Sequence, residues 1–401
     1  MPFGYVISVG VMAAGLLFAL APLRRSGSPG IVSWLFSAVV NESPFVAFYY
    51  LAAATLLAFA QDDLATPLGW VGLALVGLSM IGFPIIVRRT LRARPAVARA
   101  LDSGLGAGWR SSPDSAAAAR LNRRLTWARI LLAPIPVFPR GVERRANISY
   151  GDAGRSNLLD VYRSRSHATP GPILIHLHGG YFVTGRKSFE ARPLLHRLAR
   201  QGWVCVSANY RLRPAATFPD YLIDVKKVIA WARDHAHEYG ADRTLVFVAG
   251  SSAGAHLAAT AALTPNDPAF QPGFEQADTS VTAAIGLYGY YGPVDRTRQP
   301  LPSSPRAYVR PDSPPMLIAH GDQDTFVTPE HARRFADELR STSANPVVYV
   351  ELPGGQHSFD LFHSIRFETL INGIEAFAAS VASPRSSRRS REGRAVSARG
   401  R

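Results

Sequence analysis

Cysteine is nearly absent from this sequence, since Cys205 is the only one among 401 residues. A single cysteine excludes an internal disulfide framework and a metal site built from several thiolates. Cys205 lies within the strand-like stretch WVCVSA, where a buried and inert thiol is expected. The histidines also lack the spacing of zinc ligands, so the sequence predicts no metal site.

Charged side chains are missing from three long stretches, residues 1–23, 43–61 and 64–87. Each is close to the roughly 20 residues that a helix needs to cross a bilayer. No basic residue precedes the apolar part of the first stretch, which argues against a cleaved signal peptide. The apolar piece 31–40 is too short to span and fits the membrane interface better. We therefore predict a membrane anchor with three transmembrane helices over residues 1–87.

The charges that flank these stretches predict an orientation. Arginines follow the first and third stretches, and two aspartates follow the second. Arginine clusters stay on the cytoplasmic side of a membrane, whereas acidic residues add little. We expect a multi-pass membrane protein whose N-terminus is outside and whose chain after residue 87 is cytoplasmic. The flanking residues are Arg24, Arg25, Asp62, Asp63, Arg88, Arg89, Arg92 and Arg94.

Acidic residues are scarce, with 29 against 44 basic ones, and the net charge is +15. Much of the excess lies in residues 382–401, which are rich in Arg and Ser and show no apolar periodicity. This composition predicts a disordered basic tail. A solvated terminus is the simplest interpretation, and attraction to anionic lipid beside an anchor is an alternative. We expect no specific nucleic-acid partner, and the oligomeric state stays open.

Residues 146–381 have a different pattern, in which short β-rich apolar runs alternate with amphipathic helical periods. This alternation predicts a mostly parallel sheet with helices on both faces. The segment 88–145, rich in Arg and Ala, is expected to be a linker or a partial cap over the active site. The expected strands are 158–162, 173–178, 203–208, 244–249, 283–288, 316–320 and 347–351. The expected helices are 190–201, 220–238, 252–263, 329–341 and 360–380.

One serine stands among small residues where a strand gives way to a helix, in VFVAGSSAGAHLA. A tight strand-to-helix turn that exposes a nucleophile needs small neighbours, because the backbone packs closely there. Ser252 is the candidate nucleophile, and the amide of Ala253 would point at the same spot. The G-x-S-x-G pattern alone is weak, but the strand before it and the helix after it favour this interpretation.

A second motif, ILIHLHGGYF, also follows a strand. Attack on a carbonyl creates an oxyanion, which fixed backbone amides stabilise. Gly179 and Gly180 could supply such amides, because a glycine has no Cβ to block the substrate. His178 is expected to hold the shape of this loop.

A nucleophilic serine needs a base and an acid that orients the base. MLIAHGDQDTFV and ELPGGQHSF follow the last two expected strands, which gives the chain order Ser, Asp, His. His357 is the candidate base. Asp322 and Asp324 are both candidate acids, and Asp324 is favoured because it lies further into its loop, whereas Asp322 fits a turn.

Residues 150–380 resemble the hormone-sensitive lipase-like esterases of the α/β-hydrolase fold. The blocks HGGYFVTGRK, ANYRLRPAATFPDYLIDV, VAGSSAGAHLA and HGDQDTFV with GGQHSF carry the resemblance. It implies an α/β fold with an eight-stranded, mostly parallel sheet, preceded here by an all-α transmembrane region. It also implies that the loop at Asn209 supports the site and that Asp224 is structural. The site residues implied are a catalytic triad, Ser252, His357 and Asp324, and an oxyanion hole, Gly179, Gly180 and Ala253.

The chain departs from the family at Tyr181, where a third glycine is usual. Tyr181 could narrow the pocket, and Tyr181 and Phe182 are the expected substrate-binding residues. The proline-rich segment 289–315 leaves no room for a large helical lid, which favours short to medium acyl chains. The membrane anchor, in contrast, would bring lipid esters within reach.

The expected activity is hydrolysis of small-molecule or lipid carboxylic esters through an acyl-enzyme, without a cofactor. The HGG-x-aromatic pattern also resembles the kynurenine formamidase branch, which cleaves an N-formyl amide, so that activity is an alternative. A catalytically inactive α/β-hydrolase that serves as a binding module is a further alternative.

Overall fold

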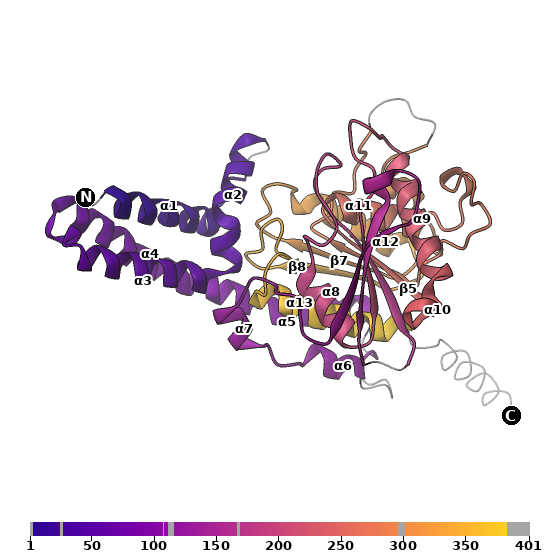
Figure 1. The fold of residues 1–401 in the computed structure, drawn as a ribbon, viewed down its shortest axis with the longest axis horizontal. Coiled ribbons are helices and arrows are strands. Elements are labelled where there is room, and N and C mark those ends of the chain that lie inside the picture. Colours follow the sequence, from indigo (N-terminus) through magenta and orange to yellow (C-terminus); the bar gives the residue numbers. More distant parts are fainter. Residues whose placement is uncertain are drawn as a thin grey trace.

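The computed structural model describes residues 3–24, 27–106, 108–110, 116–166, 169–295 and 301–382. The basic tail predicted at residues 382–401 therefore lies outside the described residues, except for residue 382. Two regions are visible in Figure 1: an α/β domain, and a group of long helices that extends from one side of it.

The α/β domain is built on an eight-stranded sheet with the order β1-β2-β4-β3-β5-β6-β7-β8. β2 runs antiparallel to both of its neighbours, and all pairs from β4 to β8 are parallel. This confirms the predicted eight-stranded, mostly parallel sheet. The strands are β1 (Val142–Ser149), β2 (Leu158–Ser164), β3 (Gly171–Leu177), β4 (Val204–Ala208), β5 (Ala241–Ser251), β6 (Ala283–Leu287), β7 (Met316–Gly321) and β8 (Val347–Leu352).

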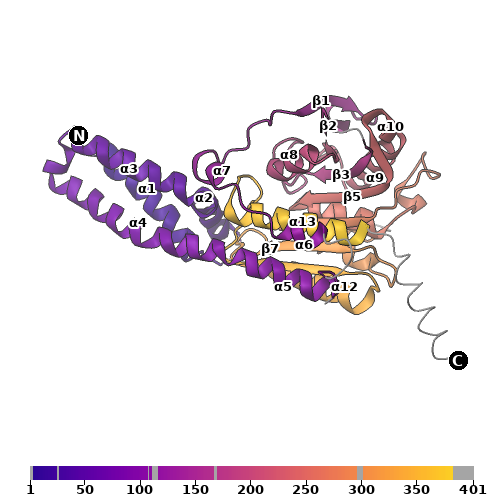
Figure 2. The same cartoon turned by 90° about the horizontal axis from the view of Figure 1, so that it is seen from below.

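Helices cover both faces of the sheet because the central strands are apolar on both sides. On one face lie α9, α10, α11 and α12, and on the other lie α5, α6, α8 and α13 (Figures 1 and 2). Their bounds are α5 (Ala93–Leu105), α6 (Ala116–Leu121), α8 (Arg192–Arg200), α9 (Asp220–Asp234), α10 (Ala236–Tyr239), α11 (Ala253–Leu263), α12 (Pro329–Thr342) and α13 (Ile365–Ala382). The 3-10 turns in the described part of the chain are η1 (Asp63–Ala65), η2 (Gly154–Asn157), η3 (Pro268–Phe270) and η4 (Pro305–Tyr308).

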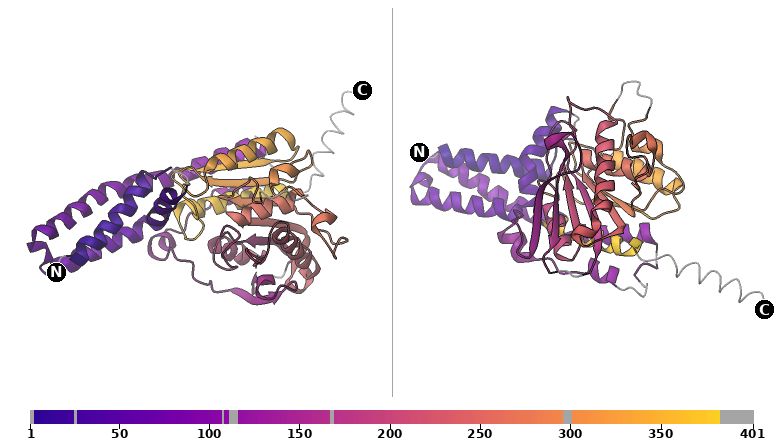
Figure 3. Two further views of the ribbon diagram at one scale, coloured as in Figure 1. Left: turned by 90° about the horizontal axis from the view of Figure 1, so that it is seen from above. Right: turned by 45° about the vertical axis from the view of Figure 1, so that its right-hand side comes forward.

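The N-terminal helices are α1 (Phe3–Leu20), α2 (Ser28–Glu42), α3 (Pro44–Ala60) and α4 (Pro67–Leu91). Helices α1, α3 and α4 run side by side away from the sheet, and α2 stands across their near end (Figures 1 and 3). Among the described residues, α1 and the segment that contains α4 are long and apolar enough to cross a membrane. Helices α2 and α3 meet at an angle of 89° at the break before Pro44. They add a third candidate span only if the two helices are counted together as a single span.

The end of α2 is fixed to the α/β domain by a buried ion pair. The carboxylate of Glu42 accepts a hydrogen bond from the guanidinium of Arg366 on α13, and both side chains are almost fully buried. Arg366 also donates to the carbonyl of Pro353, in the loop after β8. The N-terminal helices and the α/β domain therefore share a packed, charged contact.

The segment 88–145 holds α5, α6, the short α7 (Trp127–Leu132) and the first residues of β1. The expectation that it is a linker or a partial cap over the active site stays a prediction. Within it, α5 packs against β8 and α13, and α6 packs against α13. Val97 of α5 lies so close to α13 that a Cβ at Gly373 would come within 2.4 Å of it. The expected domain boundary at residue 146 falls inside β1, an edge strand whose charged residues hide its alternation.

Candidate active site

Ser252 lies in a strained turn between β5 and α11, with φ 53° and ψ −113°. The turn is possible because Gly250 and Gly254, two positions away on either side, lack side chains. A Cβ on Gly250 would come within 2.1 Å of the carbonyl oxygen of Gly254. A Cβ on Gly254 would come equally close to the carbonyl oxygen of Leu177, at the end of β3. The small residues in the motif are therefore a steric requirement of this turn.

The structure brings Ser252, His357 and Asp324 together from three loops at the carboxyl ends of parallel strands. The Oγ of Ser252 lies 3.0 Å from Nε2 of His357. On the other side of the ring, Nδ1 of His357 lies 2.7 Å from Oδ2 of Asp324. A proton on Nδ1 leaves Nε2 free to accept the proton of the serine hydroxyl.

The carboxylate of Asp324 is buried and well supplied with donors. Its Oδ1 accepts hydrogen bonds from the amides of Phe326 and Val327, at 2.9 and 2.8 Å. Its Oδ2 also lies 3.2 Å from Nε2 of His320. Burial raises the pKa of Asp324, but His357 and the hydrogen bond from His320 outweigh it and hold the pKa below its ordinary value. Asp324 is thus ionised and fixed in place.

Asp322, the other candidate acid, has a separate partner. Its Oδ1 accepts a hydrogen bond of 2.7 Å from the amide of Gly354, which joins the loops after β7 and β8. The structure therefore places Asp322 at the turn and Asp324 against His357.

The loop after β3 departs from the predicted oxyanion site. The amide of Gly179 donates a 2.5 Å hydrogen bond to Oε2 of Glu190, so it is not available to a substrate. Among the described residues, the amides of Gly180, Tyr181 and Ala253 have no such partner. The amide of Gly179 is thus occupied in this structure, and the amide of Tyr181, which has a φ of 59°, is the third free one.

Sequence reasoning also missed two acids behind this loop, the buried Asp360 and the partly buried Glu190. Asp360 accepts hydrogen bonds from Ser251 at 2.6 Å and from Tyr288 at 2.5 Å. Burial, together with the charge of Asp360, raises the pKa of Glu190 to about 8. Asp360 follows His357 by three residues and could have been noticed, but Glu190 lies outside every motif.

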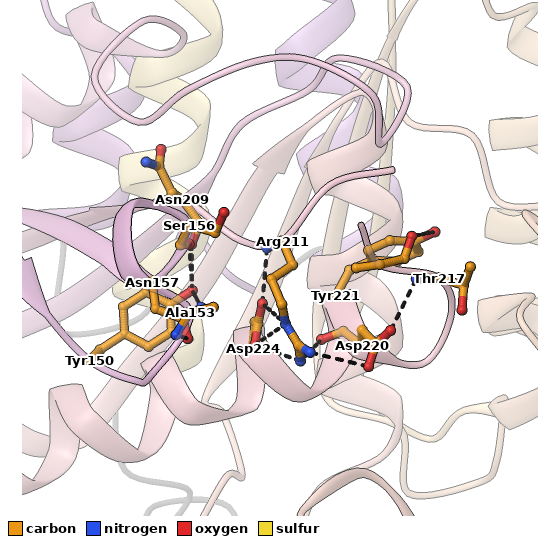
Figure 4. Close-up of polar contacts among 11 residues, drawn as sticks. Tyr150, Ala153, Ser156, Asn157, Asn209, Arg211, Thr217, Asp220, Tyr221 and Asp224 are labelled. Atoms are coloured by element: carbon orange, nitrogen blue, oxygen red, sulfur yellow. Dashed lines mark hydrogen bonds and ion pairs between the residues drawn. The ribbon is translucent and has the colours of Figure 1, made fainter. Parts of the chain in front are cut away.

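The HGG loop is held from below by the loop after β4. The hydroxyl of Tyr210 donates to the carbonyl of His178 at 2.8 Å, and the two rings stack with centroids 4.4 Å apart. Burial lowers the pKa of His178 to about 4, so its ring is neutral and shapes the loop. Figure 4 shows the next residue, Arg211, between Asp220 and Asp224, with Nε 2.9 Å from Oδ2 of Asp224.

The two predicted substrate-binding aromatics lie in different environments. Tyr181 is 67% exposed, and its ring meets Phe326 with centroids 6.3 Å apart. Phe182 is buried between Tyr221 and His256, with centroids 5.0 and 5.7 Å away. Tyr181 thus lies at the surface, whereas the structure places Phe182 in the core.

Helix α2 forms an unexpected wall beside His357. The indole Nε1 of Trp34 donates to the carbonyl of His357 at 3.1 Å, and its ring meets Phe326 with centroids 5.4 Å apart. The hydroxyl of Thr325 donates to the carbonyl of Gly30 at 2.8 Å. The sequence assigned residues 31–40 to a membrane interface but gave no sign of this contact.

Comparisons with known proteins agree with this geometry. A family model described as BD-FAE matches residues 159–300. LipM of Mycobacterium tuberculosis, described as a probable carboxylic ester hydrolase, is 37% identical over 411 aligned residues, which cover 94% of this chain and 93% of that protein. The chain belongs to this family of hormone-sensitive lipase-like carboxylesterases. It is therefore an enzyme, a carboxylic ester hydrolase.

Two further matches support the family and the fold of this esterase. Esterase LipQ of the same organism is 37% identical over 295 residues, covering 67% of this chain and 69% of that protein. A solved structure of esterase 2 from Thermogutta terrifontis with bound butyrate has a TM-score of 0.52 and 24% identity. It covers 65% of this chain and 100% of that one, and it shows the same fold.

Among the described residues, no group of three or more His, Cys, Asp or Glu side chains could hold a metal ion. His176 is instead 3.1 Å from Ser251, and the remaining histidines near the site contact carbonyls or aromatic rings.

Proposed function

We propose that this esterase acts by nucleophilic attack of Ser252 on the ester carbonyl. The alignment of Ser252, His357 and Asp324, with contacts of 3.0 and 2.7 Å, is the observation that carries the proposal. His357 removes the serine proton during attack and gives it to the departing alcohol. Asp324 stabilises the charged imidazole. Water then attacks the acyl-enzyme, with His357 again as the base, and releases the carboxylic acid.

The oxyanion of the tetrahedral intermediate is held by the amides of Gly180, Tyr181 and Ala253. Their lack of partners among the described residues supports this role, as does the position of the loop, since a Cβ built on Gly179 would lie 3.0 Å from the Cβ of Ser252. Removal of one such donor typically costs about 10²–10³ in rate. The bond from Gly179 to Glu190 fixes the loop and leaves the next two amides for the substrate.

The acyl groups accepted are short to medium in length. Trp34, Tyr181 and Phe326 crowd the approach to His357, and the ring of Phe326 lies 4.9 Å from the imidazole. Ser252 itself is only 6% exposed. In a p-nitrophenyl ester series in one detergent, the acetate and butyrate esters should react faster than the palmitate ester.

The nucleophile can be tested by covalent labelling. A fluorophosphonate probe should tag Ser252 in the full-length protein, and Ser252→Ala should lose both the tag and the hydrolysis of p-nitrophenyl butyrate. Ser251→Ala is a matched control, because Ser251 is the adjacent buried hydroxyl and points to Asp360. Unchanged turnover in purified Ser252→Ala protein would refute the proposal.

The enzyme is anchored by α1, α3 and α4 as three membrane-crossing helices, with the catalytic domain on the cytoplasmic side. The apolar lengths of α1 and α4 support this, and so do Arg88 and Arg89 in the last turn of α4. Cys205 is fully buried, so an introduced thiol can be labelled selectively. A cysteine at Asp312, whose side chain is 75% exposed, should react with an impermeant maleimide only after cells are opened. Labelling in intact cells would instead place the catalytic domain outside the cell and contradict the proposed orientation.

A further inference from the structure

Helix α2 has two unlike faces. Small and polar residues, including Gly30, Ser33, Ser37 and Asn41, are buried against the rest of the protein. The opposite side is apolar and open, with Leu35 64% exposed. A helix that turns its apolar side outward and its polar side inward is suited to hydrocarbon, not to water. The exposed residues are Ile31, Val32, Leu35, Phe36 and Val39.

The direction of α2 also fits a membrane surface. It meets α3 at 89° and stands across the end of the α1, α3 and α4 group (Figure 1). If α3 crosses a bilayer, then α2 runs along the bilayer plane. The apolar face of α2 is therefore continuous with the apolar surfaces of helices that already require lipid.

The buried face of α2 contacts both loops that carry the acid and the base. Gly30 accepts from Thr325, next to Asp324, and Trp34 donates to the carbonyl of His357 itself. At the last residue but one of the helix, Asn41 donates to the carbonyl of Gly354 at 2.8 Å. The same helix thus presents one side to lipid and the other to the reacting groups.

Arginines mark the level of the lipid headgroups at this position. Arg24, after α1, lies 3.3 Å from the carbonyl of Asp322, in the acid loop. Arg89, in the last turn of α4, donates to the carbonyls at the end of α1 and packs beside Gly354, in the base loop. Basic residues at the ends of membrane helices lie among anionic headgroups. The acid and base loops are therefore at headgroup depth.

We propose that α2 lies in the membrane interface and forms the lipid-facing wall of the entrance, so that the substrates are esters of bilayer-resident lipid alcohols. The proposal rests on the serine esterase function proposed above and specifies its substrate class. The ester carbonyls of membrane lipids lie where headgroups meet hydrocarbon, which is the depth of Trp34 and the two loops. A lipid ester reaches Ser252 by moving past α2, and its alkyl part stays in the bilayer.

The chemistry balances without any other reactant. Ser252 Oγ bonds to the acyl carbon, and the bond from that carbon to the oxygen of the lipid alcohol breaks. His357 carries the serine proton to the departing oxygen, so the lipid alcohol is left in the membrane. Water then releases the acid from Ser252 and restores the hydroxyl.

The test uses the full chain in vesicles of phosphatidylcholine and phosphatidylglycerol that contain dioleoyl-acetylglycerol. Acetate release from this lipid is compared with hydrolysis of water-soluble p-nitrophenyl acetate in the same vesicles. Leu35→Glu places a charge on the lipid face of α2, and Leu35→Met is the matched control that keeps the face apolar. Acetate release from the lipid should fall about tenfold in Leu35→Glu, with p-nitrophenyl acetate turnover within about twofold of the wild type.

Ile31→Gln, one turn earlier on the same face, gives a second measurement with a milder change and should show the same selective loss. If the variants lost activity equally on the vesicle lipid and on p-nitrophenyl acetate, the exposed face of α2 would be needed for structural packing, and the proposal would be overturned. If a dimer also dissociated, this face would be the contact with a second copy of the chain, which would overturn the proposal as well. No cleavage of the vesicle lipid by the wild type, or no effect of either variant, would also overturn it. A Ser252→Ala protein that still cleaves p-nitrophenyl acetate would instead refute the serine esterase function.

Discussion

The sharpest prediction concerns the carboxylate of Asp324. In Asp324→Asn the side chain keeps its shape but loses its charge, while the imidazole of His357 must still become positive as Ser252 attacks. Two unit charges about 4 Å apart interact by about 4 kcal/mol at an effective dielectric constant of about 20. Since each 1.4 kcal/mol is about tenfold in rate, kcat/KM should fall by about a thousandfold. Oδ2 of Asp324 lies 2.7 Å from Nδ1 of His357, so removal of this charge acts directly on the imidazole.

The chain provides a matched control two residues away. Asp322→Asn makes the same chemical change in the same loop, but its side chain can still accept the hydrogen bond from Gly354. Its kcat/KM for p-nitrophenyl butyrate should stay within about threefold of the wild type, because it does not touch the imidazole. If Asp322→Asn removed activity and Asp324→Asn did not, the assignment of the acid would be reversed. Unfolding curves for both variants separate a catalytic loss from a folding defect.

Three further predictions concern stability. Gly254→Ala should lower the free energy of unfolding by about 1–3 kcal/mol in urea titrations, because its Cβ would meet the carbonyl oxygen of Leu177 at 2.1 Å. Arg211→Lys should lower it by about 1–3 kcal/mol, because lysine cannot reproduce the forked contact with Asp224. Because the pKa of Glu190 is raised from 4.5 to about 8, the folded protein keeps a proton that the unfolded chain loses. The contribution of Glu190 to stability should therefore decline as the pH rises from 4.5 to about 8. Melting temperatures measured across this pH range should lack this decline in Glu190→Gln.

Much of the catalytic domain could be predicted because its signals are local. Seven strands were expected from apolar β-rich runs, and the triad residues follow three of those strands directly in the chain. Strand β1 was missed because VERRANIS is an exposed edge strand whose charged residues show no alternation. Periodicity reports burial, and an edge strand with little burial gives little signal.

The remaining features depend on contacts between distant parts of the chain. Gly179 was predicted as an oxyanion donor because its motif fits, but the loop folds back and brings Glu190 onto its amide. Trp34 lies 323 positions before His357, and no local pattern predicts that contact. The apolar character of residues 31–40 was visible in the sequence, whereas the contacts of α2 with the loops of the α/β domain were not.

The buried charge of Arg366 has a practical consequence for anyone who produces a soluble form of this enzyme. A fragment that begins after the hydrophobic helices would lack Glu42, and the guanidinium of Arg366 would lose its buried carboxylate partner and keep the carbonyl of Pro353. Loss of one partner of such a pair costs about 3–5 kcal/mol, which is a large share of the stability of most domains. The hydrophobic segment is therefore a folding partner of the hydrolase, and trimming it would yield a weakened protein as well as an unanchored one.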